Sequence, residues 1–386
     1  MLKLHGADAS ARIIDTGVFF MLKNYDVAVV FGGISNEHEV SIITGTMACN
    51  VLKKAGKSVL PVYITRKGDM RAGDELGDIG IYGGGSFNRY PTASVCNGGM
   101  VLFNKRGKPK CVVFLGCALN CCHGGAGEGG AVAGLFEMNN IPFASAGLFE
   151  SAAFIDKYYT KLILKSLSVK VAKYRYCRDV DGAVAGANEL GYPVIVKPCK
   201  LGSSIGIEKA ENEEQLKAAL ETAFALDDGV LIEEFLSPRR EINCAAYFAN
   251  GEVVTSPCEE VFTSGDLLSY DDKYSGGGSR KFPADLTQKT ENSIRAKTER
   301  IYKALSFRGI VRFDYIIRGQ DIFVSEINTV PGSLSQYLLS ESFSSFGGVL
   351  LSLIMQAKED FAQSRSKLKV TTGILNNIPA GAVKLK

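Results

Sequence analysis

The sequence predicts an α/β protein with more than one domain, from its length and from two kinds of pattern along the chain. At 386 residues it exceeds what one hydrophobic core usually organises, so about two or three domains are expected. An apolar run, a glycine turn, an amphipathic helix and a second apolar run follow one another between residues 27 and 64. This order is typical of a parallel α/β unit, and two further mixed units follow it.

The first unit begins with the apolar run Val27–Phe31, which fits a strand buried in a parallel sheet. Asn36 and Glu39 match a capping box at the start of the next helix, and the run Val59–Ile64 predicts the following strand. The helix face expected to be buried holds Val40, Ile43, Met47 and Val51.

Residues 66–110 are rich in glycine and polar side chains, which suggests an insertion with a hairpin around Asn104–Lys108. The sheet is expected to resume at Cys111–Leu115, before a glycine-rich loop at Gly124–Gly130 and a helix at Val132–Met138.

Two further units are read from the same patterns. The second has expected helices at Ser151–Leu167 and Glu213–Ala225 and strands at Pro193–Lys197 and Val230–Glu233. The third has a helix at Asn292–Leu305 and strands at Val311–Ile317 and Ile322–Ile327. The Gly/Ser-flanked stretch Ser264–Arg280 is expected to be mobile.

Composition narrows the class of protein. The 44 Lys+Arg against 41 Asp+Glu leave a net charge of only +3, without the basic stripe expected of a nucleic-acid binder. No apolar run reaches the roughly 18–20 residues of a membrane helix, and residues 1–20 do not match a signal peptide. We therefore expect a cytoplasmic protein without nucleic-acid or membrane partners.

The 10 cysteines are scattered through apolar stretches, which favours free thiols in a reducing compartment. Cys117, Cys121, Cys122 and His123 lie close enough in sequence to suggest zinc. A structural zinc site needs a second ligand pair at defined spacing, and none follows. Small buried thiols are the preferred interpretation.

A first chemical constellation combines Lys197, at the end of an apolar strand, with the loop Gly202–Gly206. A lysine ammonium and the backbone N–H groups of a flexible loop can hold phosphate. The lysine precedes the glycines, so this is not a Walker loop, and an ordinary turn at a strand end would leave the same pattern.

A second constellation places Arg312 and Asp314 on one predicted strand and Glu326 and Asn328 on the next. Residues at alternate positions of a strand share a face, so Asp314, Glu326 and Asn328 can converge as oxygen ligands for Mg²⁺. Arg312 shares the face of Asp314. The competing interpretation is a solvated strand pair with scattered acids.

Glu37 follows the first strand at a helix start. A buried acid there can bind an ammonium group, although a surface acid favoured by the helix dipole would look the same.

Seven motifs in register resemble the D-alanine–D-alanine ligase family, from about Asp26 to about Leu353. They are Phe31–Gly33 with Ser35–Ser41, His123–Gly125 with Gly127–Glu128, Ser151–Ala152 with Asp156–Lys157, Lys197–Pro198 with Gly202–Gly206, Asp272–Tyr274, Arg312–Asp314 and Glu326–Gly332. The resemblance implies a three-domain ATP-grasp ligase, with an N-terminal parallel-sheet domain and two α+β lobes enclosing ATP. The implied division is a 1–20 extension, an N-terminal domain 21–145, lobes 146–236 and 237–365, and a tail 366–386.

The resemblance also implies roles for individual residues. For ATP they are Lys157 and Lys197 on the phosphates, Ser203 and Ser204 in a loop that closes over them, Glu233 and Glu234 near the adenine, and Glu241 at the ribose. For Mg²⁺, which Mn²⁺ can replace, they are Asp314, Glu326 and Asn328. For the first substrate they are Glu37 and His123, with Ser203 and Tyr274 tying Glu37 to the loop.

The implied reaction is activation of a carboxylate as an acyl phosphate, followed by attack of an amine. Lys273 would neutralise the transferred phosphate, and Arg312 with the Gly332 N–H would stabilise the oxyanion. Tyr337 and Leu338 would face the second substrate. The family also suggests a homodimer.

Two departures from the family pattern concern the substrates. Gly127–Gly130 lacks an acid that the family usually carries, and Tyr337 stands where a serine usually holds the acceptor carboxylate. The leading interpretation is a ligase that forms D-alanyl-D-alanine or a close D-alanyl product for cell-wall precursors. One alternative is the same chemistry with another acceptor, such as D-serine or a larger amino compound. The other is a non-catalytic nucleotide-binding protein.

Overall fold

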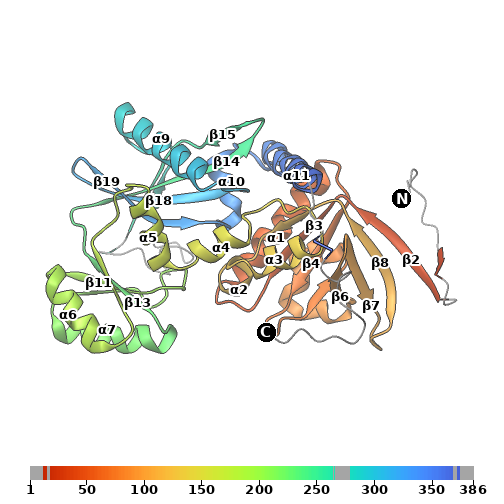
Figure 1. The fold of residues 1–386 in the computed structure, drawn as a ribbon, viewed down its shortest axis with the longest axis horizontal. Coiled ribbons are helices and arrows are strands. Elements are labelled where there is room, and N and C mark those ends of the chain that lie inside the picture. Colours follow the sequence, from red (N-terminus) through yellow and green to blue (C-terminus); the bar gives the residue numbers. More distant parts are fainter. Residues whose placement is uncertain (1–11, 15–17, 264, 266–278, 368–371, 374–386) are drawn as a thin grey trace.

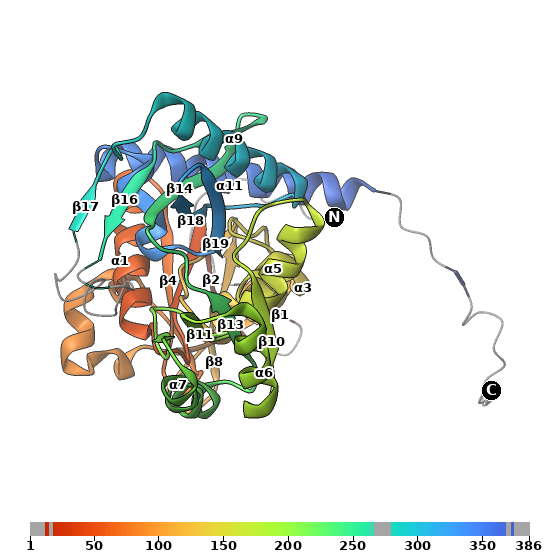
Figure 2. The same ribbon diagram turned by 90° about the vertical axis from the view of Figure 1, so that its left-hand side faces the viewer.

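The computed structural model describes residues 12–14, 18–263, 265, 279–367 and 372–373. Three α/β units follow one another along the chain (Figure 1). In the view turned by 90°, the small second unit with α6 and α7 lies below the sheet of the third unit (Figure 2). The predicted mobile segment Ser264–Arg280, with Lys273 and Tyr274, lies almost entirely outside the described residues.

The first unit is built on a nine-stranded sheet in the order β1-β2-β8-β7-β6-β5-β4-β3-β9. The strands are β1 (Arg12–Ile14), β2 (Val18–Tyr25), β3 (Val27–Gly32), β4 (Val59–Ile64), β5 (Met70–Ala72), β6 (Thr92–Cys96), β7 (Gly99–Phe103), β8 (Pro109–Leu115) and β9 (Ala118–Asn120). Its helices are α1 (His38–Lys54), α2 (Gly125–Glu128), α3 (Ala131–Met138) and the short 3₁₀ turns η1 (Asp74–Gly77), η2 (Ile79–Gly84) and η3 (Ser86–Arg89). β3 runs parallel to both β4 and β9, as the strand–helix–strand pattern predicts.

Two predictions about this unit are corrected. Residues 66–110 are not an insertion beside the sheet, because β5, β6 and β7 continue it; the predicted hairpin is confirmed, since β7 and β8 pair across the turn at 104–108. β2 crosses the boundary expected at residue 21 and pairs in parallel with β8. Lys23 and Asn24 break the apolar run that would mark a strand.

The start of α1 also differs from expectation, and its buried face differs in part: Val51 is buried as predicted and Met47 packs partly buried against the core. Glu37 occupies the N-cap position without a side-chain cap, and Glu39 pairs with Arg66 instead of forming a capping box. Ile43 is 50% exposed, whereas small residues are buried: Gly45, Ala48 and Cys49. A Cβ on Gly45 would lie 2.2 Å from the Phe31 ring, so this glycine sets how closely α1 approaches the sheet.

The second unit begins with two helices, α4 (Leu148–Phe154) and α5 (Lys157–Ser166), where the sequence suggested one. Asp156 breaks them, because its side chain accepts the N–H groups of Tyr158 and Tyr159 and caps α5. An antiparallel sheet follows in the order β10-β13-β11-β12. Its elements are β10 (Tyr174–Cys177), α6 (Val180–Leu190), β11 (Val194–Pro198), β12 (Glu208–Ala210), α7 (Glu213–Leu226) and β13 (Val230–Glu234).

The third unit has a sheet in the order β17-β16-β14-β18-β19, with β15 paired to β14. The strands are β14 (Arg240–Ala249), β15 (Glu252–Thr255), β16 (Glu259–Phe262), β17 (Ser279–Lys281), β18 (Val311–Arg318) and β19 (Asp321–Asn328). The helices are α9 (Gln288–Ala304), the 3₁₀ turn η4 (Gly332–Ser335), α10 (Gln336–Leu339) and α11 (Phe343–Ser366). β18 alternates buried and partly exposed residues, as expected for a half-covered strand.

The last helix joins the third unit to the first. Phe346, Leu350 and Leu353 of α11 share one core cluster with Leu52 of α1, and Figure 1 shows α11 lying over the first unit. Val330 and Leu334 belong to the same cluster, so the loop after β19 is held against α1. Within the described residues no single helix is long and apolar enough to span a membrane. The segments η4–α10 and α11, bent by 114° relative to each other, reach the necessary length and apolar composition only when they are taken together.

Candidate active site

A cavity of about 380 Å³ opens where the three units meet. Most of the predicted site residues line it: Glu37, His123, Lys157, Lys197, Ser203, Ser204, Glu233, Glu234, Glu241, Arg312, Asp314, Glu326, Asn328, Gly332 and Tyr337. Leu338 is buried at 3% exposure and is not among the lining residues. Residues far apart in the sequence, such as Glu37 and Tyr337, therefore converge on one site.

One end of the cavity contains a buried ion-pair cluster on α5, β11 and β13. The Glu233 carboxylate lies 3.0 Å from the Lys161 ammonium and 2.9 Å from the Lys197 ammonium. Burial alone would raise the pKa of Glu233, but the two ammonium groups outweigh it and lower that pKa to about 2. Burial lowers the pKa of Lys161, and Glu233 opposes this shift.

Lys161 was not predicted from the sequence, because a lysine within an ordinary helix carries no distinctive pattern. It is 1% exposed in the structure. Neighbouring Lys157, which was predicted, donates its ammonium to the Leu201 carbonyl and lies 3.7 Å from Glu326. Lys157 and Lys161, one turn apart on α5, thus reach the glycine loop and Glu233 respectively.

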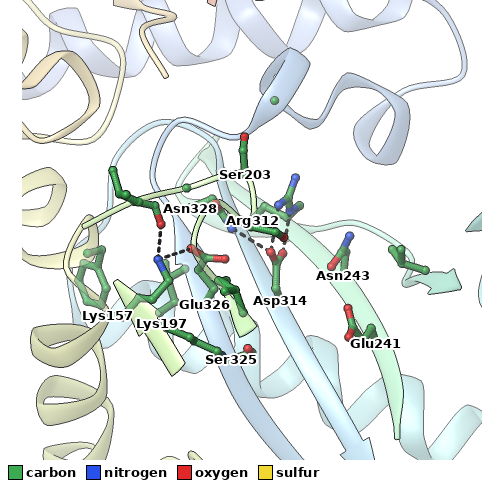
Figure 3. Close-up of a pocket in the computed structure, with 18 of the residues that line it drawn as sticks. Lys157, Lys197, Ser203, Glu241, Asn243, Arg312, Asp314, Ser325, Glu326 and Asn328 are labelled. Carbon is green, nitrogen blue, oxygen red and sulfur yellow. Dashed lines mark hydrogen bonds and ion pairs between the residues drawn. The ribbon is translucent and has the colours of Figure 1, made fainter. Parts of the chain in front are cut away.

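The paired strands β18 and β19 carry the acid cluster that the sequence predicted (Figure 3). Asp314 lies opposite Glu326 in the strand register. Arg312 donates to both Asp314 oxygens, at 2.7 and 3.0 Å, and the Asn328 amide donates to Asp314 at 3.0 Å. The bidentate pair keeps Arg312 cationic: burial opposes the charge, but Asp314 raises the pKa of Arg312 well above its usual value.

Glu37 lies between two glycine loops. Its carboxylate accepts a hydrogen bond from the Ser203 hydroxyl, which joins the first unit to the second. A Cβ on Gly124 would lie 2.7 Å from a Glu37 oxygen, and a Cβ on Gly202 would lie 2.6 Å from the same oxygen. Both positions therefore need glycine for the loops to enclose this carboxylate.

A second carboxyl group, Glu128, faces the same space. It accepts the Gly124 N–H at 2.6 Å. Burial raises the pKa of Glu128 to about 8, and the charges of Glu37 and Glu326 add to the shift. In the sequence, Glu128 stands out only as part of a glycine-rich motif, and no role was predicted for it.

His123 connects the first unit to the loop after β19. Its Nδ1 lies 2.8 Å from the Val330 carbonyl and its Nε2 2.7 Å from the Thr44 hydroxyl. A carbonyl can only accept, so Nδ1 carries the proton and Nε2 accepts from Thr44. The Thr44 oxygen in turn accepts the Ser333 N–H at 3.1 Å. Burial lowers the pKa of His123 to about 4, which keeps the ring neutral.

The opposite end of the cavity is formed by η4, α10 and β17. Ser333, Leu334 and Ser335 have φ values of 49°, 49° and 50°, a left-handed turn that L-residues adopt at a cost. The turn presents Tyr337 to the cavity, with the Arg280 guanidinium 5.4 Å from its ring centre. Arg280 was not predicted as a site residue.

The two halves of the chain match family descriptions in turn. Residues 26–146 match the description "D-ala D-ala ligase N-terminus" and residues 164–357 match "D-ala D-ala ligase C-terminus". The chain belongs to the D-alanine–D-alanine ligase family. It is accordingly an ADP-forming ligase with the ATP-grasp fold, as the sequence resemblance predicted.

Individual relatives agree with this family. The chain is 32% identical to a D-alanine–D-alanine ligase of Thermosipho africanus, over 89% of the chain and 96% of the relative. It is 33% identical to one of Acetivibrio thermocellus, over 85% of the chain and 94% of the relative.

Solved structures are similar too. A D-alanine–D-alanine ligase of Helicobacter pylori matches with a TM-score of 0.70 and 26% identity, over 86% of this chain and 98% of that one. The VanG D-Ala:D-Ser ligase of Enterococcus faecalis matches with a TM-score of 0.73 and 26% identity, over 86% and 100%.

Proposed function

We propose that this ligase joins D-alanine to D-alanine at the expense of ATP and so supplies the dipeptide for peptidoglycan precursors. The contact of Glu37 with Ser203 carries the proposal, because it places a carboxylate from the first unit beside the glycine loop of the second. That carboxylate suits the ammonium of a small amino acid. Glu37 lines the same cavity as Arg312 and the Asp314–Glu326 pair.

The first step is assigned to the region around Glu37. With its ammonium on Glu37, the first D-alanine directs its carboxylate oxygen at the γ-phosphorus of ATP. A new O–P bond forms, the bond to the bridging oxygen breaks, and ADP leaves with an acyl phosphate behind it. Lys157 and Lys197 are the proposed phosphate ligands, and Ser203 and Ser204 the proposed loop contacts.

The second step is assigned to Arg312. The amine of the second D-alanine attacks the acyl carbon and expels phosphate, and the departing phosphate takes up the proton that the amine loses. Arg312 and the Gly332 N–H are the proposed donors to the oxyanion. The proposed roles of Lys273 and Tyr274 fall outside the described residues.

The donor set of β18 and β19 fits a hard divalent cation. Asp314 and Glu326 supply two carboxylates on facing positions, and Asn328 adds an amide oxygen, since its Nδ2 is the atom bound to Asp314. We assign Mg²⁺, with Mn²⁺ as a substitute, to these three residues. Bound there, the ion would neutralise negative charge on the nucleotide phosphates.

The adenosine contacts are less direct. Glu241 is the proposed ribose ligand and currently pairs with Arg239 at 2.9 Å. Glu233 was expected near the adenine, but its carboxylate is occupied by two lysines; we assign it the task of orienting Lys197. The Glu234 carboxylate accepts the Lys173 N–H at 2.8 Å, and the Glu234 N–H donates to the Lys173 carbonyl at 3.0 Å. The adenine contact that we propose for Glu234 is therefore its backbone carbonyl. We also propose a cytoplasmic homodimer.

The test is incubation with ATP and Mg²⁺ over a panel of single amino acids and pairs, with ADP and product mass followed together. D-alanine alone should give ADP and D-alanyl-D-alanine in equal amounts. A product formed only with D-serine or a larger amine would replace the acceptor in this proposal. ADP without any new amide, or no ADP, would overturn it.

A further inference from the structure

Two neighbouring arginines stand at the start of strand β14, and the structure directs them to different partners. Arg240 does not line the cavity, and its Nε and Nη2 each lie 2.7 Å from an oxygen of Glu260. Arg239 does line the cavity, and its Nη2 lies 2.9 Å from Oε1 of Glu241. Residues at alternate positions of a strand share a face, so Arg239 and Glu241 belong to the cavity side of the sheet.

The ion pair between Arg239 and Glu241 is largely withdrawn from solvent. The Arg239 side chain is 10% exposed, whereas Arg175, in the pair that it forms with Glu189 on the surface of the second unit, is 50% exposed. A surface pair of that kind contributes little. A guanidinium that gives up most of its hydration loses free energy unless its partners replace the water, so the fold must hold Arg239 at the cavity through specific contacts.

An aromatic ring supplies the second of these contacts. Cζ of Arg239 lies 5.1 Å from the centre of the Phe235 ring, and Nζ of Lys209 lies 4.7 Å from the same centre. A guanidinium over an aromatic ring is a favourable arrangement that also fixes its plane. Lys209 belongs to β12, the strand that follows the glycine loop Gly202–Gly206. The ring therefore links Arg239 to the second unit.

The carboxylate that Arg239 holds lies beside an apolar part of the cavity. Glu241 is opposite Ile316 in the strand register (Figure 3), and Ile316 packs against the cluster formed by Ala172, Leu236 and Phe323. Three of these residues line the cavity: Ala172, Leu236 and Ile316. An apolar slot with this lining suits a planar base, and a sugar attached to that base would come within reach of Glu241.

The ion pair prepares Glu241 to accept a hydrogen bond from a sugar hydroxyl. Arg239 contacts Oε1, which restricts the side-chain torsions of Glu241 and leaves Oε2 to face a ligand. A side chain ordered in advance loses less entropy when it binds, and a hydrogen bond to an ionised acceptor is stronger than one between neutral groups. A site built to bind a hydroxyl rejects the analogue that lacks it.

We propose that Arg239 is a positioning residue that sets the preference of this ligase for ribonucleotides over deoxyribonucleotides. It does so by holding Glu241 toward the sugar hydroxyls, with Phe235 and Lys209 fixing its own position. This inference rests on the proposed function, in which Glu241 is the ribose ligand, and adds to it a specificity-determining residue and the class of nucleotide that is rejected. Because Arg239 reaches the sugar only through Glu241, its loss should alter the choice of nucleotide more than the joining of amino acids.

The test is a competition at equal concentrations between ATP and a deoxynucleotide, with Mg²⁺ and D-alanine, run once with 2′-deoxyATP and once with 3′-deoxyATP. ADP and deoxyADP differ in mass, so their ratio measures discrimination, and the two analogues show which hydroxyl is recognised. Arg239→Met keeps an apolar stem for the Phe235 ring and should reduce the preference for ATP about three- to tenfold, the usual contribution of one hydrogen bond. Arg239→Lys should fall between it and the wild type, because an ammonium keeps the charge but loses the planar fork.

Arg175→Met is the matched control, since the exposed pair of Arg175 with Glu189 lies outside the cavity. Its product ratio should equal that of the wild type. Glu241→Ala removes the proposed ligand itself and should abolish most of the preference, which sets the largest change that the other variants can approach. Lys209→Met should have a smaller effect than Arg239→Met, because the aromatic ring is still present. A general loss of folding would reduce both products together and leave their ratio unchanged.

The outcomes separate this inference from the proposed function. A wild type that prefers ATP, with an unchanged ratio in Arg239→Met, would overturn the role of Arg239 and leave the ligase intact. A higher preference in Arg239→Met would also overturn it, because Arg239 would then compete with the sugar for Glu241. A wild type that forms dipeptide equally well with all three nucleotides would overturn the ribose assignment and this inference alone, whereas one that forms no dipeptide would overturn the proposed function. A reduced ratio in Arg239→Met with a normal ratio in Arg175→Met supports the assignment.

Discussion

At the end of the cavity assigned to nucleotide, Lys161, Lys197 and Glu233 form a closed ion-pair cluster in which every side chain is nearly buried. At the end assigned to the acceptor, Arg280 is half exposed and meets its acid, Glu259, only at 3.6 Å. The charges of the first cluster are paired with one another without any ligand, whereas the Arg280 guanidinium at the second end is partly exposed and can donate hydrogen bonds to a ligand.

This difference matches what each end must do. A polyanion with several charges needs lysines held in advance, because a loose lysine would lose side-chain entropy on binding. A small amino acid carries one carboxylate and needs only one open fork. We therefore expect the end assigned to the nucleotide to contribute to the fold as well as to binding, and the end assigned to the acceptor to contribute mainly to selectivity.

The largest effect should come from the acid cluster between the two ends. Glu326→Gln keeps shape but removes one charged metal ligand, and turnover should fall at least about a hundredfold, since metal positioning contributes several kcal/mol. Steady-state release of ADP measures it. Asp321→Asn on the same strand is the control, because Asp321 does not line the cavity and forms an exposed ion pair with Lys170 at 2.7 Å. Turnover within about threefold of the wild type in Glu326→Gln would remove the metal assignment.

Substitutions in the ion-pair cluster at the nucleotide end should have the larger effect on folding stability. Lys161→Met leaves Glu233 with one cation and should lower the free energy of unfolding by about 3–5 kcal/mol, as is usual for a broken buried pair. Urea denaturation measures it. Lys165→Met on the exposed face of the same helix should change it by less than about 0.5 kcal/mol. Equal stability of the two variants would mean that the cluster serves binding alone.

The stability of the loop that forms the acceptor end of the cavity should depend on Thr44. Thr44→Val removes the hydroxyl between His123 and the Ser333 N–H and should cost about 1–3 kcal/mol, because both partners are left without it. Thermal unfolding and the acceptor KM should change together. Thr46→Val is the control, as the Thr46 hydroxyl bonds only within its own helix, to Ile42 and Ile43. A change in stability without a change in KM would separate the loop from acceptor binding.

The smallest effect is a pH dependence at Glu128. Its pKa of about 8 in the folded protein lies above the ordinary value of 4.5, so the folded state binds the extra proton. Stability should therefore fall as pH rises from about 4.5 to about 8, but only slightly, because the Glu128 side chain is partly exposed and solvent screens its charge. Glu128→Gln should flatten this part of the curve, measured by denaturation at several pH values. Parallel curves for the two proteins would contradict the raised pKa.

Several features of this protein follow from the sequence by itself. Apolar runs without polar interruption predicted β3 and β4 to the residue or nearly so, because a strand buried on both faces has one simple pattern. Alternate residues on two adjacent strands predicted that Asp314, Glu326 and Asn328 would meet, because strand geometry is local. The motif order was sufficient for the family.

Other features were decided by tertiary structure. The buried face of α1 was predicted only in part, at Val51 and Met47, because the sheet and α11 both cover this helix and periodicity no longer marks a single side. Lys161 and Arg280 look like surface charges in the sequence, and only the packing of α5 against β13 and of β17 beside α10 gives them partners. Burial, pKa and ion pairing depend on what lies across the cavity, which local sequence does not encode. The strands and the family were therefore readable in advance, whereas the partners of the charged groups were not.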